Sequence, residues 1–433
     1  MRPQSENSCL FYVQQSGPRL EYILSVLFDG KFAITQDVST FISFQGPKLQ
    51  YTQEKIFQDT IHIQPQGILF NSTIQPIIFE CSMWNEVPIF FQGQGDIPFD
   101  LPGAAFYLIT RYEEYLSFEP DEIGRYPHTA SIAFQENFLS IPIIQHWVAL
   151  LKKKIGNHFF QSIPHKPLWV PGYDADILFK YQFQSSFTSM GKFVRNLWEG
   201  NSDELLLQWK VMRGRIPDPF DIWEQLWHFC ENEKIVPRFF FSGNEQQRDF
   251  DKQTSFRHPK VSAIIKGCQQ HGKLGWHPSF QCSASKPKME KELAQFQSVA
   301  PEKIIDVRFH YLRFTLPQSY RWLLDLGIEN DYSMGYGAVN GFRASYSDSF
   351  FWFDLERNQV TSLRIHPFCF MDSTCYFHLQ STPEDSFLFA KKLQSENNGL
   401  VKQLACVFHP HLLAIPSWWH MHYQLMEHTD LIK

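Results

Sequence analysis

The sequence predicts an α/β protein whose C-terminal part, residues 166–433, is built on a parallel sheet or barrel with helices outside it. Short apolar runs alternate there with helical patterns at about the length of a βα unit. The chain has 433 residues, which is long enough for two domains. Residues 1–165 are expected to form a smaller mixed α+β domain.

Composition excludes several classes of partner. Hydrophobic residues make up 43% of the chain and charged residues 19%, as is typical of a globular protein with a large core. The net charge of -6 and the scattered Lys and Arg argue against nucleic acid and anionic membranes. The eight scattered Cys are expected to be reduced thiols. No signal peptide or membrane-spanning run is found, so we expect a cytoplasmic protein, whose oligomeric state the sequence does not indicate.

The N-terminal part contains both helical and strand patterns. Apolar residues at helical spacing predict a helix over 20–27, and β-type runs predict strands at 32–35 and 68–70. A stripe from Ala105 to Leu116 predicts an amphipathic helix, with Arg111 and Glu114 on its polar side, either as functional residues or, as is commoner, as a surface ion pair. A second amphipathic helix runs through Trp147 and Leu151. We interpret this part as a scaffold or recognition surface, and a scaffold for a partner protein is one hypothesis.

Prolines and polar residues at 161–169 predict the domain boundary. Beyond it the expected strands and helices alternate. Strand-like runs occur at 167–177, 236–243, 272–279 and 304–314, and helix-like runs at 204–210, 220–230, 261–270, 290–298 and 319–327.

Two acids follow the first of these runs. If the chain is still extended there, Asp174 and Asp176 lie on one face, with Ala175 on the other. Carboxylates this close both stay ionised only with a cation or strong donors between them. A divalent metal site and an acid/base role are the two functional interpretations, and capping of a following helix or turn is the structural one.

Further polar residues follow later apolar runs. In folds of this kind the working residues lie where strands end and loops begin. This rule selects a set of candidates after the runs: His277, Arg308, His310, Arg313, Arg343 and His409, with His366 and Asp372 as further members.

Several of these stretches, in this order, resemble the polysaccharide deacetylase family, in particular a two-domain bacterial subgroup. They are GYDADI, GWHPS, VRFHYLRF, DYSMGYGAVNGFRAS and LRIHPFCFMD, and the N-terminal AAFYLITRYEEYL and GRYP resemble the uncharacterised domain of that subgroup. The resemblance covers nearly the whole chain. It implies a distorted (β/α) barrel and metal-dependent removal of N- or O-acetyl groups from sugars.

The resemblance also implies roles for individual residues. Asp174 stands at the family's general base and Asp176 near its metal-binding acid, although Ala175 separates two acids that are adjacent in most members. His277 matches the first His of the family's His-x-x-x-His metal pair, while Gln281 stands in the second position. A metal needs about three protein ligands, so His310 is the expected replacement, with Asp174 as a further possible ligand. The cofactor is a divalent metal, zinc or a similar ion.

His409 follows an apolar run, as does the family's catalytic general acid, and Arg308 or Arg343 could orient the base through a bidentate ion pair. The expected substrate is an acetylated sugar or glycan precursor. The alternative is a degenerate barrel that binds a glycan or sugar nucleotide without turnover, because the second metal His is missing.

Overall fold

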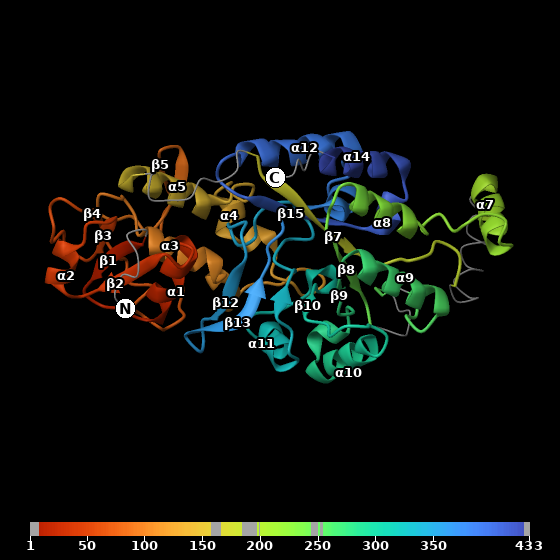
Figure 1. The fold of residues 1–433 in the computed structure, drawn as a ribbon, viewed down its shortest axis with the longest axis horizontal. Coiled ribbons are helices and arrows are strands. Elements are labelled where there is room, and N and C mark those ends of the chain that lie inside the picture. The colour runs from red at the N-terminus through yellow and green to blue at the C-terminus, as the bar shows by residue number, and fades with distance from the viewer. Residues whose placement is uncertain are drawn as a thin grey trace.

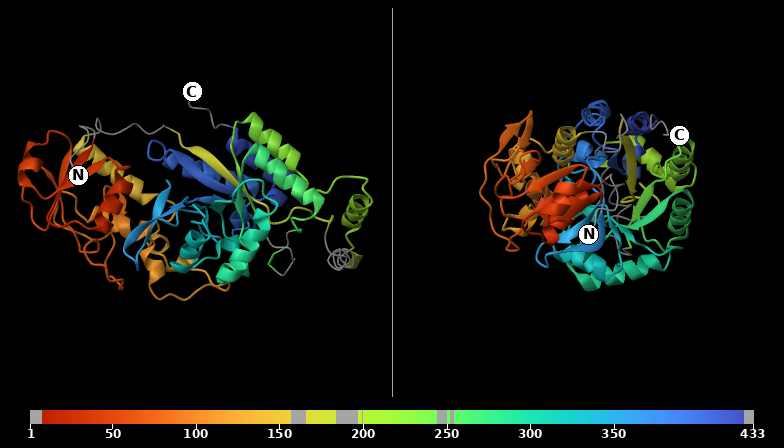
Figure 2. Two further views of the ribbon diagram at one scale, coloured as in Figure 1. Left: turned by 60° about the horizontal axis from the view of Figure 1, so that its bottom comes forward. Right: turned by 60° about the vertical axis from the view of Figure 1, so that its left-hand side comes forward.

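Two larger sheets and one two-stranded sheet organise the described residues of the chain (Figure 1). The structure is a computed structural model and describes residues 8–156, 166–183, 197–198, 200–243, 250–251 and 254–427. The boundary predicted at 161–169 falls largely outside these residues. Figure 2 shows the N-terminal sheet at one end of the molecule and the strands of the larger sheet in the middle.

The N-terminal sheet has four parallel strands in the order β2 (Phe32–Thr35), β1 (Cys9–Val13), β3 (Lys48–Tyr51) and β4 (Ile61–Ile63). Helix α1 (Pro18–Leu27) connects β1 to β2, so the helix and strand expected there are confirmed. The strand expected at 68–70 is wrong. Gly67 has φ +93°, and its carbonyl accepts the N–H groups of Phe70 and Asn71, which makes a turn. The remaining elements are α2 (Val38–Ser43), β5 (Ser82–Trp84) and β6 (Val87–Ile89).

The long amphipathic helix expected up to Leu116 is also corrected. Helix α3 (Leu101–Ile109) ends earlier, because Arg111 adopts the left-handed conformation with φ 54° before the short 3-10 helix η1 (Tyr112–Tyr115). Every residue of α3 is buried, so this helix has no solvent face. Arg111 and Glu114 do pair, at 2.8 Å, but both are buried, so the ion pair does not lie on the surface as expected. After η2 (His128–Ala130) and α4 (Ile132–Gln135), the expected second helix is α5 (Ile143–Ile155).

The larger sheet has nine strands in the order β12-β13-β11-β10-β9-β8-β7-β15-β14. All neighbours are parallel except β12 and β13, which confirms the predicted parallel sheet. The strands are β7 (Leu168–Asp174), β8 (Arg238–Phe241), β9 (Lys273–Trp276), β10 (Asp306–Val307), β11 (Asn330–Asp331), β12 (Phe350–Asp354), β13 (Gln359–Ile365), β14 (Phe370–Met371) and β15 (Gln403–Phe408).

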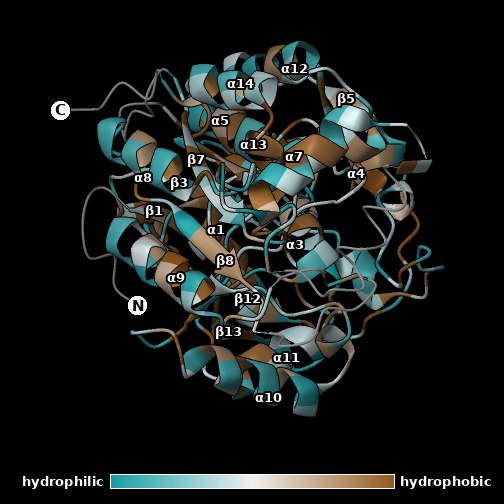
Figure 3. Ribbon diagram, turned by 90° about the vertical axis from the view of Figure 1, so that its right-hand side faces the viewer, coloured by the Kyte–Doolittle hydropathy of each residue, from teal (hydrophilic) through white to brown (hydrophobic). Residues whose placement is uncertain are grey.

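Helices surround these strands (Figure 3). The helices are α7 (Ser202–Met212), α8 (Trp223–Asn232), α9 (Pro259–His271), α10 (Lys286–Gln297), α11 (Gln318–Asp325), α12 (Pro383–Glu396), α13 (Pro410–Leu413) and α14 (Pro416–Met426), with short turns η4 (Cys282–Ala284), η5 (His310–Leu312) and η6 (Thr374–His378). The helices that pack on the sheet turn buried apolar residues toward it, whereas α7 projects away from the strands at one end of the molecule, with Leu206, Trp209 and Met212 exposed (Figure 1).

The large sheet is strongly curled. Asp174 ends β7 and Arg308 follows β10, three strands away, which is about 14 Å in a flat sheet. Their side chains nevertheless lie 2.6 Å apart. Within the described residues no strand pairing joins the edge strands β12 and β14, so a barrel closed by strand pairing is not found.

The two sheets share one continuous hydrophobic core. Backbone hydrogen bonds also cross between the two parts, from the Phe342 N–H to the Leu139 carbonyl and from the Ile144 N–H to the Ser345 carbonyl. All eight Cys lie in the described residues and are free thiols. Within the same residues, no helix has both the length and the hydropathy required to cross a membrane.

Candidate metal centre and active site

The carboxyl ends of four strands bring the central candidates together. Asp174 is the last residue of β7, and Asp176 lies two residues beyond it. His277 directly follows β9 and His409 directly follows β15, while His310 begins η5 just after β10. Because the strands are parallel, these ends meet at one edge of the sheet.

Asp176 lies among three imidazole rings. Its Oδ1 is 3.2 Å from Nε2 of His277 and 3.6 Å from Nε2 of His310, and its Oδ2 is 3.5 Å from Nε2 of His409. Oδ1 is buried and has no hydrogen-bond partner, because none of these contacts has hydrogen-bond geometry. The Asp176 side chain is 18% exposed, so solvent reaches the cluster.

The Nδ1 atoms of His277 and His310 each donate a hydrogen bond to an oxygen atom. Nδ1 of His277 donates to the Arg308 carbonyl at 2.5 Å, and Nδ1 of His310 donates to Oδ1 of Asp251 at 2.9 Å. In the neutral rings Nε2 is therefore the unprotonated nitrogen, and it faces Asp176. This orientation is typical of metal-binding histidines.

The geometry of this group fits a metal ion. Its ligand atoms, from Asp176, His277 and His310, all lie within 4.8 Å of one another. Tetrahedral ligands at metal distances of about 2.0 to 2.1 Å are separated by about 3.3 Å, close to the observed 3.2 and 3.6 Å. Two imidazoles and one carboxylate suit zinc and other first-row divalent ions.

The charges of the cluster agree with this fit. Burial raises the pKa of Asp176, but the charge of His310 and contacts with His277 and His409 hold that pKa well below its usual range. Burial lowers the pKa of His310, but the charge of Asp176 and the Asp251 hydrogen bond raise it to about 10. The carboxylate thus favours a positive charge at the site.

His409 faces the other oxygen of Asp176 and is held by a buried carboxylate. Its Nδ1 donates to Oδ1 of Asp372 at 2.6 Å, and its backbone N–H donates to Oδ2 of the same residue at 2.8 Å. Burial lowers the pKa of His409, but Asp372, with smaller contributions from Asp176 and Asp174, raises it to about 9. The ring is therefore oriented and favoured in its proton-carrying form.

Asp174 has a different partner from Asp176. Nη1 of Arg308 donates to its Oδ1 at 2.6 Å, while Nε of Arg308 donates to the Tyr332 carbonyl at 3.0 Å. The ion pair is thus a single contact, not the expected bidentate one. Gly172 makes room for it, since a Cβ there would lie 2.7 Å from Nη2 of Arg308.

The structure does not bring Arg343 to this cluster, which corrects the expectation that it could orient the base. Its Nε and Nη2 donate to the two carboxylate oxygens of Glu114 at 2.9 and 2.7 Å. Nε of Arg111 donates to the same carboxylate at 2.8 Å. Arg343 therefore belongs to a buried ionic group that joins the two parts of the chain.

The remaining sequence candidates also lie outside the central cluster. Arg313 donates to the carbonyls of Ile123 and Phe280. His366 stacks on Tyr332 at a ring distance of 4.3 Å, and burial lowers its pKa to about 3. Gln281 is exposed and is not part of the metal-ligand group.

Sequence reasoning missed Asp251, and it named Asp372 without recognising its partner. Asp251 follows β8 after a stretch outside the described residues, so no nearby apolar run marks it as a strand-end residue. The sequence analysis also missed Glu292, whose carboxylate accepts the Ser279 N–H at 2.8 Å and fixes the turn after His277. Each acts through a contact distant in sequence, which periodicity does not reveal.

Replacing Asp251 by Ala is expected to weaken metal binding about 10- to 100-fold, because His310 loses the acceptor that fixes its ring. Titration of zinc into the metal-free protein against a competing chelator measures this. The control is Asp100→Ala, which removes a buried carboxylate that caps α3 in the N-terminal part. It should lower stability and leave zinc affinity unchanged, and wild-type zinc affinity in Asp251→Ala would refute the role of Asp251.

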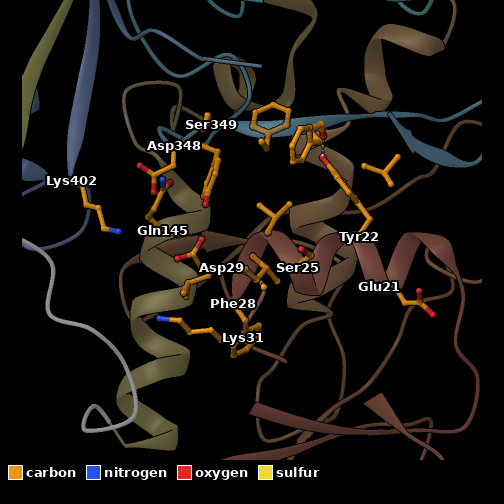
Figure 4. Close-up of a pocket in the computed structure, with 18 of the residues that line it drawn as sticks. Glu21, Tyr22, Ser25, Phe28, Asp29, Lys31, Gln145, Asp348, Ser349 and Lys402 are labelled. Atoms are coloured by element: carbon orange, nitrogen blue, oxygen red, sulfur yellow. Dashed lines mark hydrogen bonds between the residues drawn. The ribbon is translucent and has the colours of Figure 1, made fainter. Parts of the chain in front are cut away.

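A cavity of about 1650 Å³ lies elsewhere, between α1, α5 and strands of the large sheet (Figure 4). The residues lining it include Lys31, Lys402, Asp29 and Asp348, but none of the five central residues. Its lining mixes charges of both signs and so selects no ligand class. The cluster at the strand ends, and not this cavity, is the candidate site.

The sequence profile of a protein family of unknown function (DUF7033) matches residues 9–160. No curated protein matches the chain. Solved structures to which the chain is similar include a candidate polysaccharide deacetylase from Mycobacterium smegmatis, with 12% identity, a TM-score of 0.39, and coverage of 63% of this chain and 89% of that one. A probable polysaccharide deacetylase from Pseudomonas aeruginosa PAO1 has 10% identity, a TM-score of 0.38, and coverage of 61% and 84%. A CE4 family pseudoenzyme from Bacillus anthracis has 7% identity, a TM-score of 0.33, and coverage of 61% and 63%. Similarities of this size carry no conclusion about activity.

Proposed function

We propose that the chain is a metal-dependent hydrolase that removes acetyl groups from a carbohydrate, with residues 166–433 as a distorted deacetylase-type barrel and residues 1–165 as an N-terminal domain packed against it. The observation that supports this most is the grouping of Asp176, His277 and His310 between an arginine-paired Asp174 and an aspartate-paired His409. The motifs shared with polysaccharide deacetylases supply the reaction class.

Each residue has a distinct task in cleaving the amide or ester bond. A divalent metal held by Asp176, His277 and His310 would polarise the acetyl carbonyl and lower the pKa of a bound water. Asp174 accepts the proton of the attacking water, and Arg308 keeps its carboxylate in place. His409 donates a proton to the leaving nitrogen or oxygen as its bond to the acetyl carbon breaks, while Asp372 holds the ring.

Exposed aromatic rings beside the cluster support a carbohydrate substrate. Tyr311, next to His310, is 39% exposed, and Phe250, next to Asp251, is 42% exposed. Their ring centroids lie 5.7 Å apart. Aromatic rings bind the apolar faces of sugar rings, so these two exposed and mutually perpendicular rings offer contact surface for a sugar beside the metal group. An acetylated sugar or glycan precursor is the proposed substrate.

Metal removal tests the proposal. We expect the protein purified without chelator to carry about one divalent ion per chain and to release acetate from N-acetylglucosamine oligomers. Dialysis against a chelator should abolish acetate release, and added zinc or cobalt should restore it, because His310 completes the ligand set in place of the missing second His.

The absence of a His at position 281 motivates a second candidate, a barrel that binds a glycan or sugar nucleotide without turnover. Elemental analysis and acetate release distinguish the two. Protein that binds the oligomers but neither carries metal nor releases acetate would support the second candidate and end the first.

A further inference from the structure

The turn that carries His310 has an unusual backbone. Tyr311 and Leu312, which follow His310 directly, have φ values of 58° and 54°. Two successive left-handed residues that are not glycine are unfavourable and persist only where the surrounding structure holds them. The position of His310 therefore depends on what restrains this turn.

Residues of the N-terminal part restrain it on both sides. Nη1 of Arg125 donates to the Tyr311 carbonyl at 2.8 Å, and the Ile123 carbonyl accepts Nε of Arg313 at 2.8 Å. Both contacts come from one short segment, residues 121–125. They contact Tyr311, which directly follows His310, and Arg313, which ends the turn.

The segment 121–125 is itself held in one shape. The Asp121 carboxylate accepts the N–H groups of Ile123 and Arg125 at 3.2 and 2.8 Å, and it accepts Nε of Arg125 at 2.7 Å. Gly124 has φ +83° and closes the loop. These hydrogen bonds fix the position of the Arg125 guanidinium, which donates to the Tyr311 carbonyl.

We propose that the segment 121–125 is a positioning element for the metal ligand His310, so that the N-terminal domain completes the metal centre of the other domain. Arg125 is the central positioning residue. This inference rests on the proposed function, because it assumes that His310 binds the metal. It assigns a task to part of the region that matches the family of unknown function.

Two variants test it through different residues. Arg125→Met removes the hydrogen bond to Tyr311 and keeps most of the side-chain volume. In Gly337→Ala the new Cβ would lie 2.6 Å from Nη1 of Arg125, so the guanidinium must move while Arg125 itself stays unchanged. Both variants should raise the dissociation constant for zinc at least about tenfold, as loss of a support behind a metal ligand does.

The matched control is Tyr22→Phe. Tyr22 also donates across the interface between the two parts to a backbone carbonyl, that of Phe351, at 2.7 Å. This variant should lose as much stability to denaturant as Arg125→Met but keep wild-type zinc affinity. The readouts are zinc titration into the full-length, metal-free protein and the visible absorption spectrum of the cobalt form, which reports ligand geometry.

Three results would overturn the inference. Unchanged zinc affinity and cobalt spectra in both variants would mean that the contact is only structural. Equal weakening in all three variants would mean that the interface acts by general loosening. If the wild type bound neither ion, the proposed metal site would fail too, which separates that failure from the first two results.

Discussion

Asp174→Asn is expected to lower kcat for acetate release by a factor of about 10² to 10⁴, the usual contribution of a general base. The substitution keeps the shape of the side chain but removes its ability to accept a proton. Arg308 would still have an oxygen to bind, so the fold and the metal group should persist. The measurement is the kcat for N-acetylglucosamine oligomers together with the metal content of the same sample.

The control for this variant is Asp354→Asn. Asp354 is fully buried and pairs with Arg321 at 2.7 Å, but it lies at the end of β12, the far edge strand of the sheet. This variant should lose stability and keep kcat. Acetate release at the wild-type rate by Asp174→Asn would exclude Asp174 as the base.

Asp176→Ala is expected to remove the metal and, with it, measurable turnover. Its carboxylate lies within 3.6 Å of a ring nitrogen of each of His277, His310 and His409. Without it, two neutral imidazoles remain as ligands, fewer than a firmly held divalent ion needs. Elemental analysis after gel filtration should find far less than one ion per chain, and acetate release should fall to background.

Asp96→Ala provides the comparison for this loss. Asp96 is a carboxylate of the N-terminal part, 34% exposed, that pairs with Lys55. Its removal should change neither metal content nor turnover. Stoichiometric metal in Asp176→Ala would show that other residues hold the ion, and the assignment of Asp176 would then be wrong.

Sequence alone determined the parallel sheet and most of the residues at its working edge. Buried parallel strands contain short apolar runs, so β7 and β15 can be recognised from the sequence pattern. Asp174 and His409 stand at the ends of these runs, and parallel strands bring such ends to one edge. For that reason strand order was not needed to expect these side chains near one another.

The local hydrophobic pattern predicted a wrong helix end where a contact between residues distant in sequence determines the backbone conformation. The stripe that continues past Ile109 predicts a longer helix, but Arg111 leaves the helical conformation. In this left-handed conformation the Arg111 guanidinium donates hydrogen bonds to Glu114 and to the carbonyl of Arg343, which lies 232 residues away in the chain. Burial of this ionic group is a property of the assembled interface between the two parts.

Tertiary structure alone decided which partner each site residue has. Arg308 and Arg343 are both candidate partners of the base in the sequence, yet only Arg308, which follows β10, reaches Asp174 at the end of β7, whereas Arg343 pairs with Glu114. The support of His310 by Asp251, and of its turn by Arg125, depends on loops that meet only after folding. Periodicity records which side of an element is buried, whereas partner choice depends on the distance between elements, which is set by curvature and packing.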